Sequence, residues 1–585
     1  MILSLLTTTL LLLARPGASS PSPSHCKTYP GDAGWPSLAD WRTLNRTVGG
    51  NLFAYVPLGS VCSSTSSQYD AAGCASVRSK WVTQALVQAD PGLVRATTYT
   101  NNTCNPPAVA VGAPCTQGYY PEYVLQAKNR RDIAAVVRFA KKRNLRLNIK
   151  NTGHDFIGRS IARGSLSIWL HEWKGSEFFS DFKTSCPGSK AQYAGKITGG
   201  NQWKDTYSEA LAAGRLVVGG ASASVGSVGG YIQGGGHSPW GAHYGMAADQ
   251  VLEFEAVGLD GKIITINECT NPDLFWALRG GGGGTFAVVT SVTIKTYPIP
   301  EKIVVGSLLL STTDLSGVAD TWWSGIGAVN EALGQLSEAG VMGYYYTTPS
   351  IKSFSFTIYH FDVTPEQTRA AFAPLMAKLQ AISASANSTG LLTSTLTVSA
   401  TSYASLVAGY AADNGTAVVS TGGGFLMSSR LLPASAMSDD PAAFLAAFRT
   451  AANGATQLLG HLVAGGKVAR NANLSVALNA AWRNAISHMI VLETTSSGAE
   501  PAAVEAQRLA LAKRTSGLRK LSPGSGAYIN ECDLHEENKY QAFFGSSIDR
   551  LLQIKNKVDP TGLLYCGNCV GSDDWTVTDG KVCAK

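Results

Sequence analysis

Residues 145–160, LRLNIKNTGHDFIGRS, contain the pattern that decides the predicted fold class. Leu145, Leu147 and Ile149 alternate with polar residues, which predicts a strand. The preceding stretch, 131–140, has apolar residues at helical spacing and runs into a basic cluster, which a helix C-terminus favours. The chain then breaks at residues 151–154, NTGH, a strand-to-loop junction of the kind at which α/β proteins place ligands.

A second unit with strand and helix, rich in glycine, follows up to about residue 300. Residues 196–198 precede two glycines, and a helical stretch ends at Gly214. Glycine-dense segments lie at 199–200, 219–220, 226–236 and 280–284. None is a clean GxGxxG that opens a helix after a strand, so a Rossmann fold is poorly supported. Any one segment could be only a tight turn, but together they would let backbone approach a flat or anionic ligand. The region is predicted to be α+β.

The loop at residues 153–160, GHDFIGRS, differs from a phosphate-binding P-loop at one position. Arg159 stands where that motif requires lysine, whose compact ammonium group reaches the β- and γ-phosphates. A nucleotidase is therefore disfavoured. The weaker expectation is that this loop surrounds a phosphate with backbone N–H groups.

The composition indicates a large globular protein. Of 585 residues, 45% are hydrophobic and 15% charged, against roughly 25% charged in typical soluble chains, and 62 are glycine. A disordered polyelectrolyte is excluded. The net charge is +7, but no run of basic residues is long enough to form the positive stripe that a nucleic-acid-binding protein needs. Neither the HExxH motif of zinc proteases nor the GxSxG nucleophile elbow occurs, so no motif supports a hydrolase.

The N-terminus predicts a secreted protein. An apolar run at residues 2–13, followed by small residues, is typical of a signal peptide and is shorter than the ~20 residues that span a membrane. No later segment is long and apolar enough to span. Five N-x-S/T sequons fit a glycosylating pathway: Asn45, Asn101, Asn387, Asn414 and Asn473.

Eleven cysteines, five of them before residue 116, predict disulfide bonds in an oxidising compartment. Cys566 and Cys569 form a CxxC motif without a second such motif, which favours structural bridges over a zinc site. The odd count leaves one thiol free, for which we choose Cys532. His237 and His243 lack a carboxylate at helical spacing, so we expect hydrogen-bonding roles for both and no metal site.

From about residue 302 to 520 the composition shifts to Ala, Ser and Thr with aromatic, strand-like runs at 344–346 and 354–359. This shift marks a second domain. Length alone, at roughly 150 residues a domain, allows about four domains or two large ones.

Several stretches together resemble the vanillyl-alcohol-oxidase (PCMH-type) flavoprotein superfamily, and within it the secreted berberine-bridge-enzyme-like FAD-linked oxidases of fungi. They are residues 150–155, the block 225–249 with GGYIQGGGHSPWGAHYGMAAD, NPDLFWALR at 271–279 with the glycines after it, YINE at 528–531 and DPTGLLY at 559–565. The resemblance covers most of residues 110–300 and 520–575.

The resemblance implies an α+β fold with a two-subdomain FAD-binding domain and a substrate domain built on an antiparallel sheet backed by helices. The expected organisation is a signal peptide at 1–20, a disulfide-rich segment at 21–117, the FAD domain at 118–300, the substrate domain at 301–520 and a returning C-terminal segment at 521–585.

For the cofactor, the resemblance implies FAD bonded to His154 through its 8α-methyl group. Many relatives have a second link through a cysteine, but none occurs between 186 and 269, so a single link is predicted. The expected cofactor-binding residues are His154, Lys150, Asn151, Thr152, Gly153, Asp155, Gly158, Gly220, Ser224, Val225, Gly229, Gly230, Gly234, Gly235, His237 and Asn530.

Flavin oxidation of an alcohol needs hydride delivery to the ring N5 and a base for the proton. Candidates are Tyr528, Glu531 and Asp533 on an expected C-terminal strand, whose alternation would put Tyr528 with Asn530 and Cys532 on one face and Glu531 with Asp533 on the other. Since the Asn530 face should meet the flavin, we weight Tyr528 over Glu531 as catalytic residue. Tyr344, Tyr346, Tyr359 and His360 of the substrate domain remain unranked.

The predicted function is a secreted, monomeric oxidase that reduces O₂ to hydrogen peroxide while oxidising an alcohol-bearing small molecule: a secondary metabolite, a lipid-like alcohol or a sugar. No nucleic-acid or membrane partner is expected. The alternatives are an FAD-dependent dehydrogenase with another electron acceptor and a non-catalytic glycan-binding protein that has kept the fold.

Overall fold

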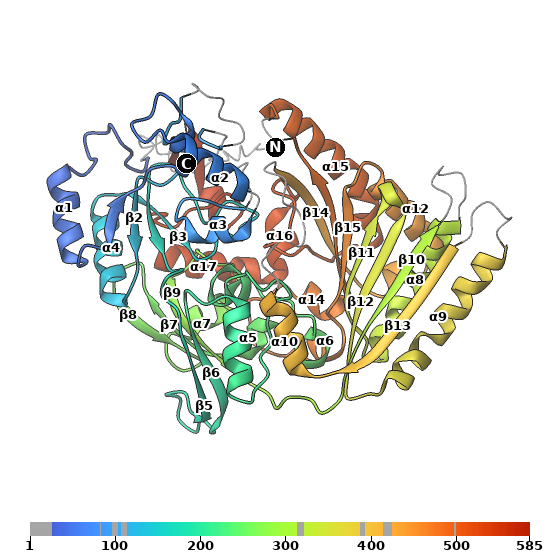
Figure 1. Ribbon diagram of the computed structural model, residues 1–585. Helices are drawn as coiled ribbons and strands as arrows, with labels where there is room; N and C mark the ends of the chain where they lie inside the picture. The colour runs from blue at the N-terminus through green and yellow to red at the C-terminus, as the bar shows by residue number, and fades with distance from the viewer. Residues whose placement is uncertain are drawn as a thin grey trace, which may run out of the picture.

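The computed structural model describes residues 26–81, 83–95, 103–106, 114–312, 321–385, 392–412, 424–496, 499–578 and 580–585. Figure 1 shows two bodies side by side, one built from both ends of the chain and one from its middle. We call them the two-ended domain (residues up to 299 with those from 526 on) and the sheet domain (303–521). The predicted α+β architecture is confirmed.

The first subdomain of the two-ended domain is a four-stranded sheet in the order β1-β2-β4-β3, with β2 and β3 parallel to β4. The predicted helix and strand are confirmed as α4 and β3. Asn129 caps α4 by accepting a hydrogen bond from the Asp132 N–H at 3.0 Å, and the apolar face of the helix is buried. Its elements are α1 (Leu38–Thr47), β1 (Leu52–Ala54), η1 (Leu58–Cys62), α2 (Ala71–Lys80), α3 (Gln84–Ala89), β2 (Tyr123–Gln126), α4 (Arg130–Lys142), β3 (Arg146–Lys150) and β4 (Ser165–Trp169).

The second subdomain is an antiparallel five-stranded sheet in the order β5-β6-β9-β7-β8. Its helix α5 ends before Gly214, whose φ of +69° suits glycine and closes the helix as predicted. Its elements are β5 (Ser176–Phe182), β6 (Gln192–Thr198), α5 (Trp203–Ala212), η3 (Ser227–Tyr231), α6 (Gly241–Tyr244), η4 (Ala247–Gln250), β7 (Val251–Val257), β8 (Ile263–Ile266), α7 (Pro272–Ala277) and β9 (Val288–Lys295).

The sheet domain contains a seven-stranded antiparallel sheet in the order β13-β10-β12-β11-β15-β16-β14. Helices α8, α9, α12 and α15 cover its outer face, and the other face turns toward the two-ended domain (Figure 1). Its strands are β10 (Ile303–Thr312), β11 (Met342–Thr348), β12 (Ser353–Phe361), β13 (Leu392–Thr401), β14 (Phe425–Leu432), β15 (Gln457–Leu462) and β16 (Ser487–Thr494). Its helices are α8 (Thr321–Glu338), η5 (Pro349–Ile351), α9 (Pro365–Ser385), α10 (Tyr403–Ala412), α11 (Ser435–Ser438), α12 (Pro441–Ala452), α13 (Gly466–Arg470), α14 (Ala481–Asn484) and α15 (Pro501–Leu521).

The C-terminal segment returns to the two-ended domain through α16 (Lys539–Phe544), η6 (Gly545–Ser547), α17 (Ile548–Val558), η7 (Ser572–Asp574), β17 (Trp575–Thr578) and β18 (Lys581–Ala584). The buried Lys555 ammonium donates to the Thr285 and Leu564 carbonyl oxygens and to Asp559, at 2.9, 2.8 and 2.7 Å. The Cys26–Cys583 disulfide joins the two ends of the described chain.

Disulfides confirm the cysteine prediction. The remaining bridges are Cys62–Cys74, Cys104–Cys115, Cys186–Cys269 and Cys566–Cys569, so the CxxC motif closes on itself. Cys532 is free and buried, as predicted. The predicted signal peptide and the sequons at Asn101, Asn387 and Asn414 lie outside the described residues, whereas Asn473 is exposed and Asn45 is partly exposed.

A buried ion pair fastens the two domains together. The Arg483 guanidinium in α14 donates to both carboxylate oxygens of Asp249, at 2.9 and 2.8 Å, and both side chains are buried. Such a two-point contact fixes orientation as well as distance. No helix in the described part of the chain has the length and apolarity needed to cross a membrane.

Candidate active site

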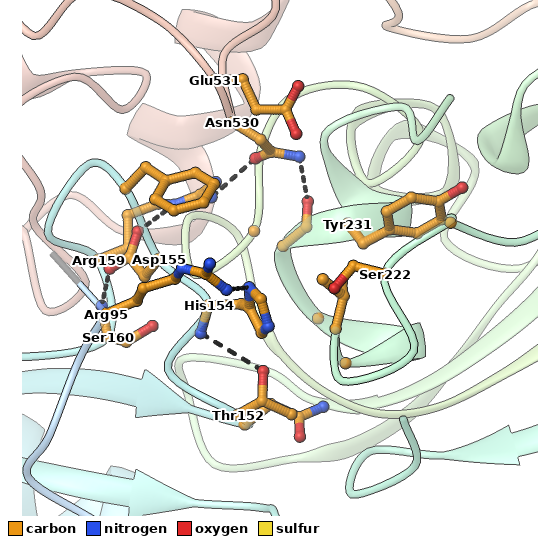
Figure 2. Close-up of a pocket in the computed structure, with 18 of the residues that line it drawn as sticks. Arg95, Thr152, His154, Asp155, Arg159, Ser160, Ser222, Tyr231, Asn530 and Glu531 are labelled. Atoms are coloured by element: carbon orange, nitrogen blue, oxygen red, sulfur yellow. Dashed lines mark hydrogen bonds and ion pairs between the residues drawn. The ribbon is translucent and has the colours of Figure 1, made fainter. Parts of the chain in front are cut away.

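A cavity of about 360 Å³ lies between the two-ended domain and the free face of the sheet. Figure 2 shows side chains from the loop after β3, from the glycine-rich loops and from the C-terminal segment around it. Its size is in the range of small-molecule and cofactor sites. Of the predicted cofactor residues, those that line it are Asn151, Thr152, Gly153, His154, Asp155, Gly220, Val225, Gly229, Gly230, His237 and Asn530.

The loop after β3 is held rigid by its own side chains. The Asp155 carboxylate accepts hydrogen bonds from the backbone N–H groups of Ile157, at 3.1 Å, and Ser160, at 2.7 Å. Gly153 and Gly158 have φ values of +76° and +77°, a region that favours glycine. The loop therefore turns back sharply and leaves His154 at the cavity wall.

The glycine-rich loops approach one another too closely for side chains. A Cβ on Gly283 would lie 2.7 Å from the Gly230 Cα, and one on Gly230 would lie 3.0 Å from an Arg159 guanidinium nitrogen. Asn151 Oδ1, Arg159 Nη1 and Gln233 Oε1 are buried without a hydrogen-bond partner among the described residues. Unpaired buried polar atoms around a cradle of glycine fit a large polar ligand with phosphate groups.

His154 sits between two polar side chains. Its Nε2 lies 2.7 Å from Ser224 Oγ. Its Nδ1 lies 3.5 Å from an Arg95 guanidinium nitrogen, as Figure 2 shows. Burial, with the Arg95 charge, holds the pKa of His154 well below its usual value. The ring is therefore neutral, which leaves one nitrogen with a lone pair that can form a covalent bond.

The C-terminal residues reach the cavity by a turn and not by the expected strand. The Glu531 N–H donates to the Tyr528 carbonyl oxygen at 3.0 Å, and residues 526–533 form no strand. Without strand alternation, Tyr528, Asn530 and Glu531 all line the cavity. The predicted division into two faces is therefore wrong.

Asn530 ties this turn to the glycine-rich loops. Its side-chain oxygen accepts from Arg159 at 2.7 Å (Figure 2). Its amide donates to the Gly230 carbonyl oxygen at 2.9 Å and to the Tyr528 hydroxyl at 2.6 Å. The other two residues of the expected strand point away: Cys532 is buried beside the Ile529 carbonyl, and Asp533 lies 3.9 Å from Arg508.

Glu531 faces three histidines. Its Oε2 lies 3.4 Å from His237 Nε2, 3.5 Å from His488 Nδ1 and 4.0 Å from His461 Nδ1. Burial acts to raise the pKa of Glu531, but His237 and His461 together outweigh it, so the net shift is downward and the group is a carboxylate. Burial, together with the neighbouring His237, lowers the pKa of His461 and His488 well below the usual value.

The sheet forms the opposite wall. Strand register places Tyr344, His461 and His488 side by side on β11, β15 and β16, and the next row holds Tyr346, Leu459 and Ile490. Beyond them the wall is apolar, with Phe425, Met427 and Leu492, and Phe156 of the loop after β3 packs against Phe425. Tyr344 and Tyr346, unranked in sequence, are thus cavity residues.

Other predicted residues lie away from the cavity. Lys150, Gly158, Ser224, Gly234 and Gly235 are not among the lining residues, although the Ser224 hydroxyl contacts His154. The Lys150 ammonium donates to the Val87 carbonyl oxygen at 2.8 Å, and burial lowers its pKa to about 7. Tyr359 contacts Tyr410, and His360 lies beside Thr368, so neither reaches the cavity.

The sequence patterns did not predict His461, His488 or Arg95 as site residues. They placed Arg159 only at the lysine position of a P-loop and did not predict it in the cavity. The two histidines lie in ordinary apolar strands, and only cross-strand pairing brings them to Glu531. His243, by contrast, lies 3.6 Å from Asp362 outside the cavity, so it and His237 do not converge.

Two family models match the chain. Residues 121–267 match the FAD binding domain, and residues 527–567 match the family described as berberine and berberine like. The first match contains His154 and most of the glycine-rich loops, and the second contains the turn with Asn530 and Glu531.

Relatives that match nearly the whole chain are also flavin-linked oxidoreductases. An uncharacterized FAD-linked oxidoreductase of Arthroderma benhamiae is 36% identical over 96% of this chain and 97% of its own length. The VAO-type flavoprotein oxidase VAO615 of Thermothelomyces thermophilus is 33% identical over 96% of each chain.

Solved structures show the same fold. The VAO-type flavoprotein MtVAO713 of Myceliophthora thermophila has a TM-score of 0.88 at 30% identity, over 96% of this chain and all of that chain. A glucooligosaccharide oxidase of Acremonium strictum, at 19% identity and a TM-score of 0.62 over 78% of this chain and 92% of that chain, shares the fold alone. The chain therefore belongs to the VAO-type, berberine-bridge-enzyme-like family of FAD-linked oxidoreductases.

Proposed function

We propose that this FAD-linked oxidoreductase is an oxidase that oxidises an alcohol group on a largely apolar small molecule and reduces O₂ to hydrogen peroxide. The observation that carries the proposal is the cavity, with a neutral His154 on one wall and the Glu531 carboxylate and an apolar sheet face on the other. The relative VAO615, which is named a flavoprotein oxidase, supports it.

Two groups of residues would hold FAD, one at its phosphates and one at its ring system. The loop after β3 and the glycine cradle, with Asn151 and Arg159, would meet the phosphates, and His154 and Asn530 would border the ring system. When bound, FAD supplies two-electron chemistry: it takes a hydride from the alcohol carbon and returns both electrons to O₂.

A single covalent link through His154 is part of the proposal. The glucooligosaccharide oxidase of Acremonium strictum is described as holding FAD through both a cysteinyl and a histidyl bond. Here Ser222 lines the cavity near His154, and Ser224 contacts the His154 imidazole. The nearest cysteines in the sequence are Cys186 and Cys269. We therefore expect the histidyl bond alone in this chain.

Glu531 is the better candidate for accepting the substrate's hydroxyl proton. Its carboxylate is ionised and faces the cavity, whereas burial raises the pKa of Tyr528, which stays protonated. Tyr528 is suited to donate a hydrogen bond to the substrate oxygen. This reverses the order of the two candidates that strand alternation suggested.

The lining favours a lipid-like alcohol or an apolar secondary metabolite over a sugar. Phe425, Met427, Leu459, Ile490 and Leu492 make the part of the sheet wall beyond Tyr344, Tyr346 and His461 apolar. Sugar hydroxyls buried against such a wall would lose hydrogen bonds to water without replacement, at about 1–3 kcal/mol for each group.

The test is a panel of alcohols that contains long-chain, aromatic and sugar substrates, assayed by peroxide release. Apolar alcohols should give stoichiometric peroxide, and the anaerobically reduced protein should reoxidise at once when mixed with air. Slow reoxidation with turnover on an artificial acceptor would identify a dehydrogenase instead. A colourless purified protein would favour the glycan-binding alternative.

Replacing Glu531 by Gln should lower kcat by about 10²–10⁴, because a positioned general base contributes that factor. Steady-state peroxide release and anaerobic flavin reduction with the best substrate measure the effect. Glu537→Gln is the matched control, since that side chain is 80% exposed, and it should keep the wild-type rate. Full flavin reduction by Glu531→Gln at the wild-type rate would rule Glu531 out.

We further propose that the protein is a secreted monomer. Five disulfides support an oxidising compartment. Peptide mass analysis of protein from the culture medium tests cleavage near residue 20, and light scattering tests the oligomeric state.

A further inference from the structure

Three histidines and one glutamate converge from four separate segments at the polar end of the cavity. His237 follows the glycine-rich loop, His461 lies on β15, His488 on β16 and Glu531 on the C-terminal turn. One ligand-type atom from each side chain lies within 4.8 Å of the other three. His461 and His488 are directly paired across the strands, so the sheet itself fixes their separation.

The separations match the edges of a metal-centred tetrahedron. Bonds of about 2.0–2.1 Å from Zn²⁺ to imidazole nitrogen or carboxylate oxygen give edges of about 3.3 Å. The Glu531 Oε2 lies 3.4 Å from His237 Nε2 and 3.5 Å from His488 Nδ1, and the two Nδ1 atoms of His461 and His488 lie 3.4 Å apart. The longest measured edge to Glu531, from His461, is 4.0 Å.

Hydrogen bonding alone accounts poorly for these contacts. The Nδ1 atoms of His461 and His488 face each other and the same carboxylate oxygen. If both carried a proton toward Glu531, two N–H groups would oppose each other. If only one did, its N–H would be shared between the other nitrogen, at 3.4 Å, and the carboxylate, at 3.5 Å or more, and both distances are long for a hydrogen bond. A cation between them would satisfy every lone pair at once.

A second contact orients His237 toward the same point. Its Nδ1 lies 3.2 Å from the Tyr344 hydroxyl, which leaves Nε2 directed at Glu531. Ligating histidines usually have their other ring nitrogen held in this way.

We propose that His237, His461, His488 and Glu531 form a binding site for a divalent transition-metal ion of the zinc class. Three imidazoles and a carboxylate suit Zn²⁺, Co²⁺, Ni²⁺ or Cu²⁺, whereas Mg²⁺ and Ca²⁺ prefer sites built entirely from oxygen ligands. The sequence patterns predicted no metal here because the four ligands are scattered over nearly 300 positions, from 237 to 531.

Chelator-treated, flavin-loaded protein should bind one Zn²⁺ per chain and should not bind Mg²⁺. Elemental mass spectrometry after gel filtration and titration calorimetry measure the binding. His461→Gln and His488→Gln should each weaken Zn²⁺ binding by more than about 100-fold, because even outer-shell partners are worth about 10–100-fold. His243→Ala, which removes a histidine outside the cavity, is the control and should bind normally. Thermal melts confirm that each variant is folded.

Binding of less than one Zn²⁺ per chain, or equal binding by the wild type and both glutamine variants, would overturn the site. One further arm rests on the proposed function: if Glu531 is also the proton acceptor, Zn²⁺ should suppress peroxide release and a chelator should restore it. Stoichiometric Zn²⁺ binding with unchanged turnover would leave the metal site standing and refute the role of Glu531 as base.

Discussion

A His154→Ala protein should release all of its flavin on acid precipitation, whereas the wild-type pellet should stay yellow. The physical reason is that the rigid loop after β3 presents one neutral histidine to the cavity, and the described residues that line the cavity include no cysteine. The absorbance of the supernatant and the mass of the His154 peptide measure the result. The peptide from the wild type should be heavier by the mass of FAD less the two hydrogens lost when the bond to the 8α-methyl group forms.

His243→Ala is the matched control, because that histidine lies outside the cavity, and its flavin should stay in the pellet. Flavin that remains with precipitated His154→Ala would refute the covalent assignment, and a second flavin-bearing peptide in the wild type would refute the single link. If the variant binds no flavin at all, adding FAD to the refolded protein and measuring fluorescence quenching separates lost affinity from a lost bond.

Replacing Arg483 by Met should destabilise the protein by about 3–5 kcal/mol, the usual cost of breaking a buried ion pair from one side. Asp249 would keep hydrogen bonds from Asn471, at 2.9 Å, and from the Met246 N–H, at 3.0 Å, but it would lose two charge-assisted bonds. The pair joins the two domains, so we also expect weaker flavin retention after mild denaturant treatment. Urea titration followed by tryptophan fluorescence measures the stability change.

Lys378→Met provides the comparison, because it removes an exposed ion pair with Glu331 and should cost less than about 1 kcal/mol. The double replacement of Asp249 by Leu and Arg483 by Met should recover part of the loss, since no buried charge is then left alone. An Arg483→Met protein that unfolds within about 0.5 kcal/mol of the wild type would contradict the stabilising role of this ion pair.

Local sequence patterns were enough for the α4 helix, the β3 strand and the loop that holds His154. Apolar spacing determines which face of a helix or strand is buried, and two glycines with positive φ let the loop turn. The same kind of reasoning failed at residues 526–533. A C-terminal strand with two alternating faces was expected there, but the segment crosses between two domains, where the Asn530 side chain bonds to Gly230 and Arg159 and the Glu531 N–H turns back to the Tyr528 carbonyl oxygen.

The α+β class, the FAD-binding family and the loop of His154 follow from short motifs and local periodicity, so the chain alone was sufficient to predict them. The set of polar groups that meet at the reacting end of the cavity depends instead on tertiary packing. His461 and His488 are separated by 27 positions and contact each other through strand register, and Glu531 joins them from a turn that follows the sheet domain. Contacts of this kind arise from how the sheet and the C-terminal segment pack together, and no periodicity in the chain records that packing.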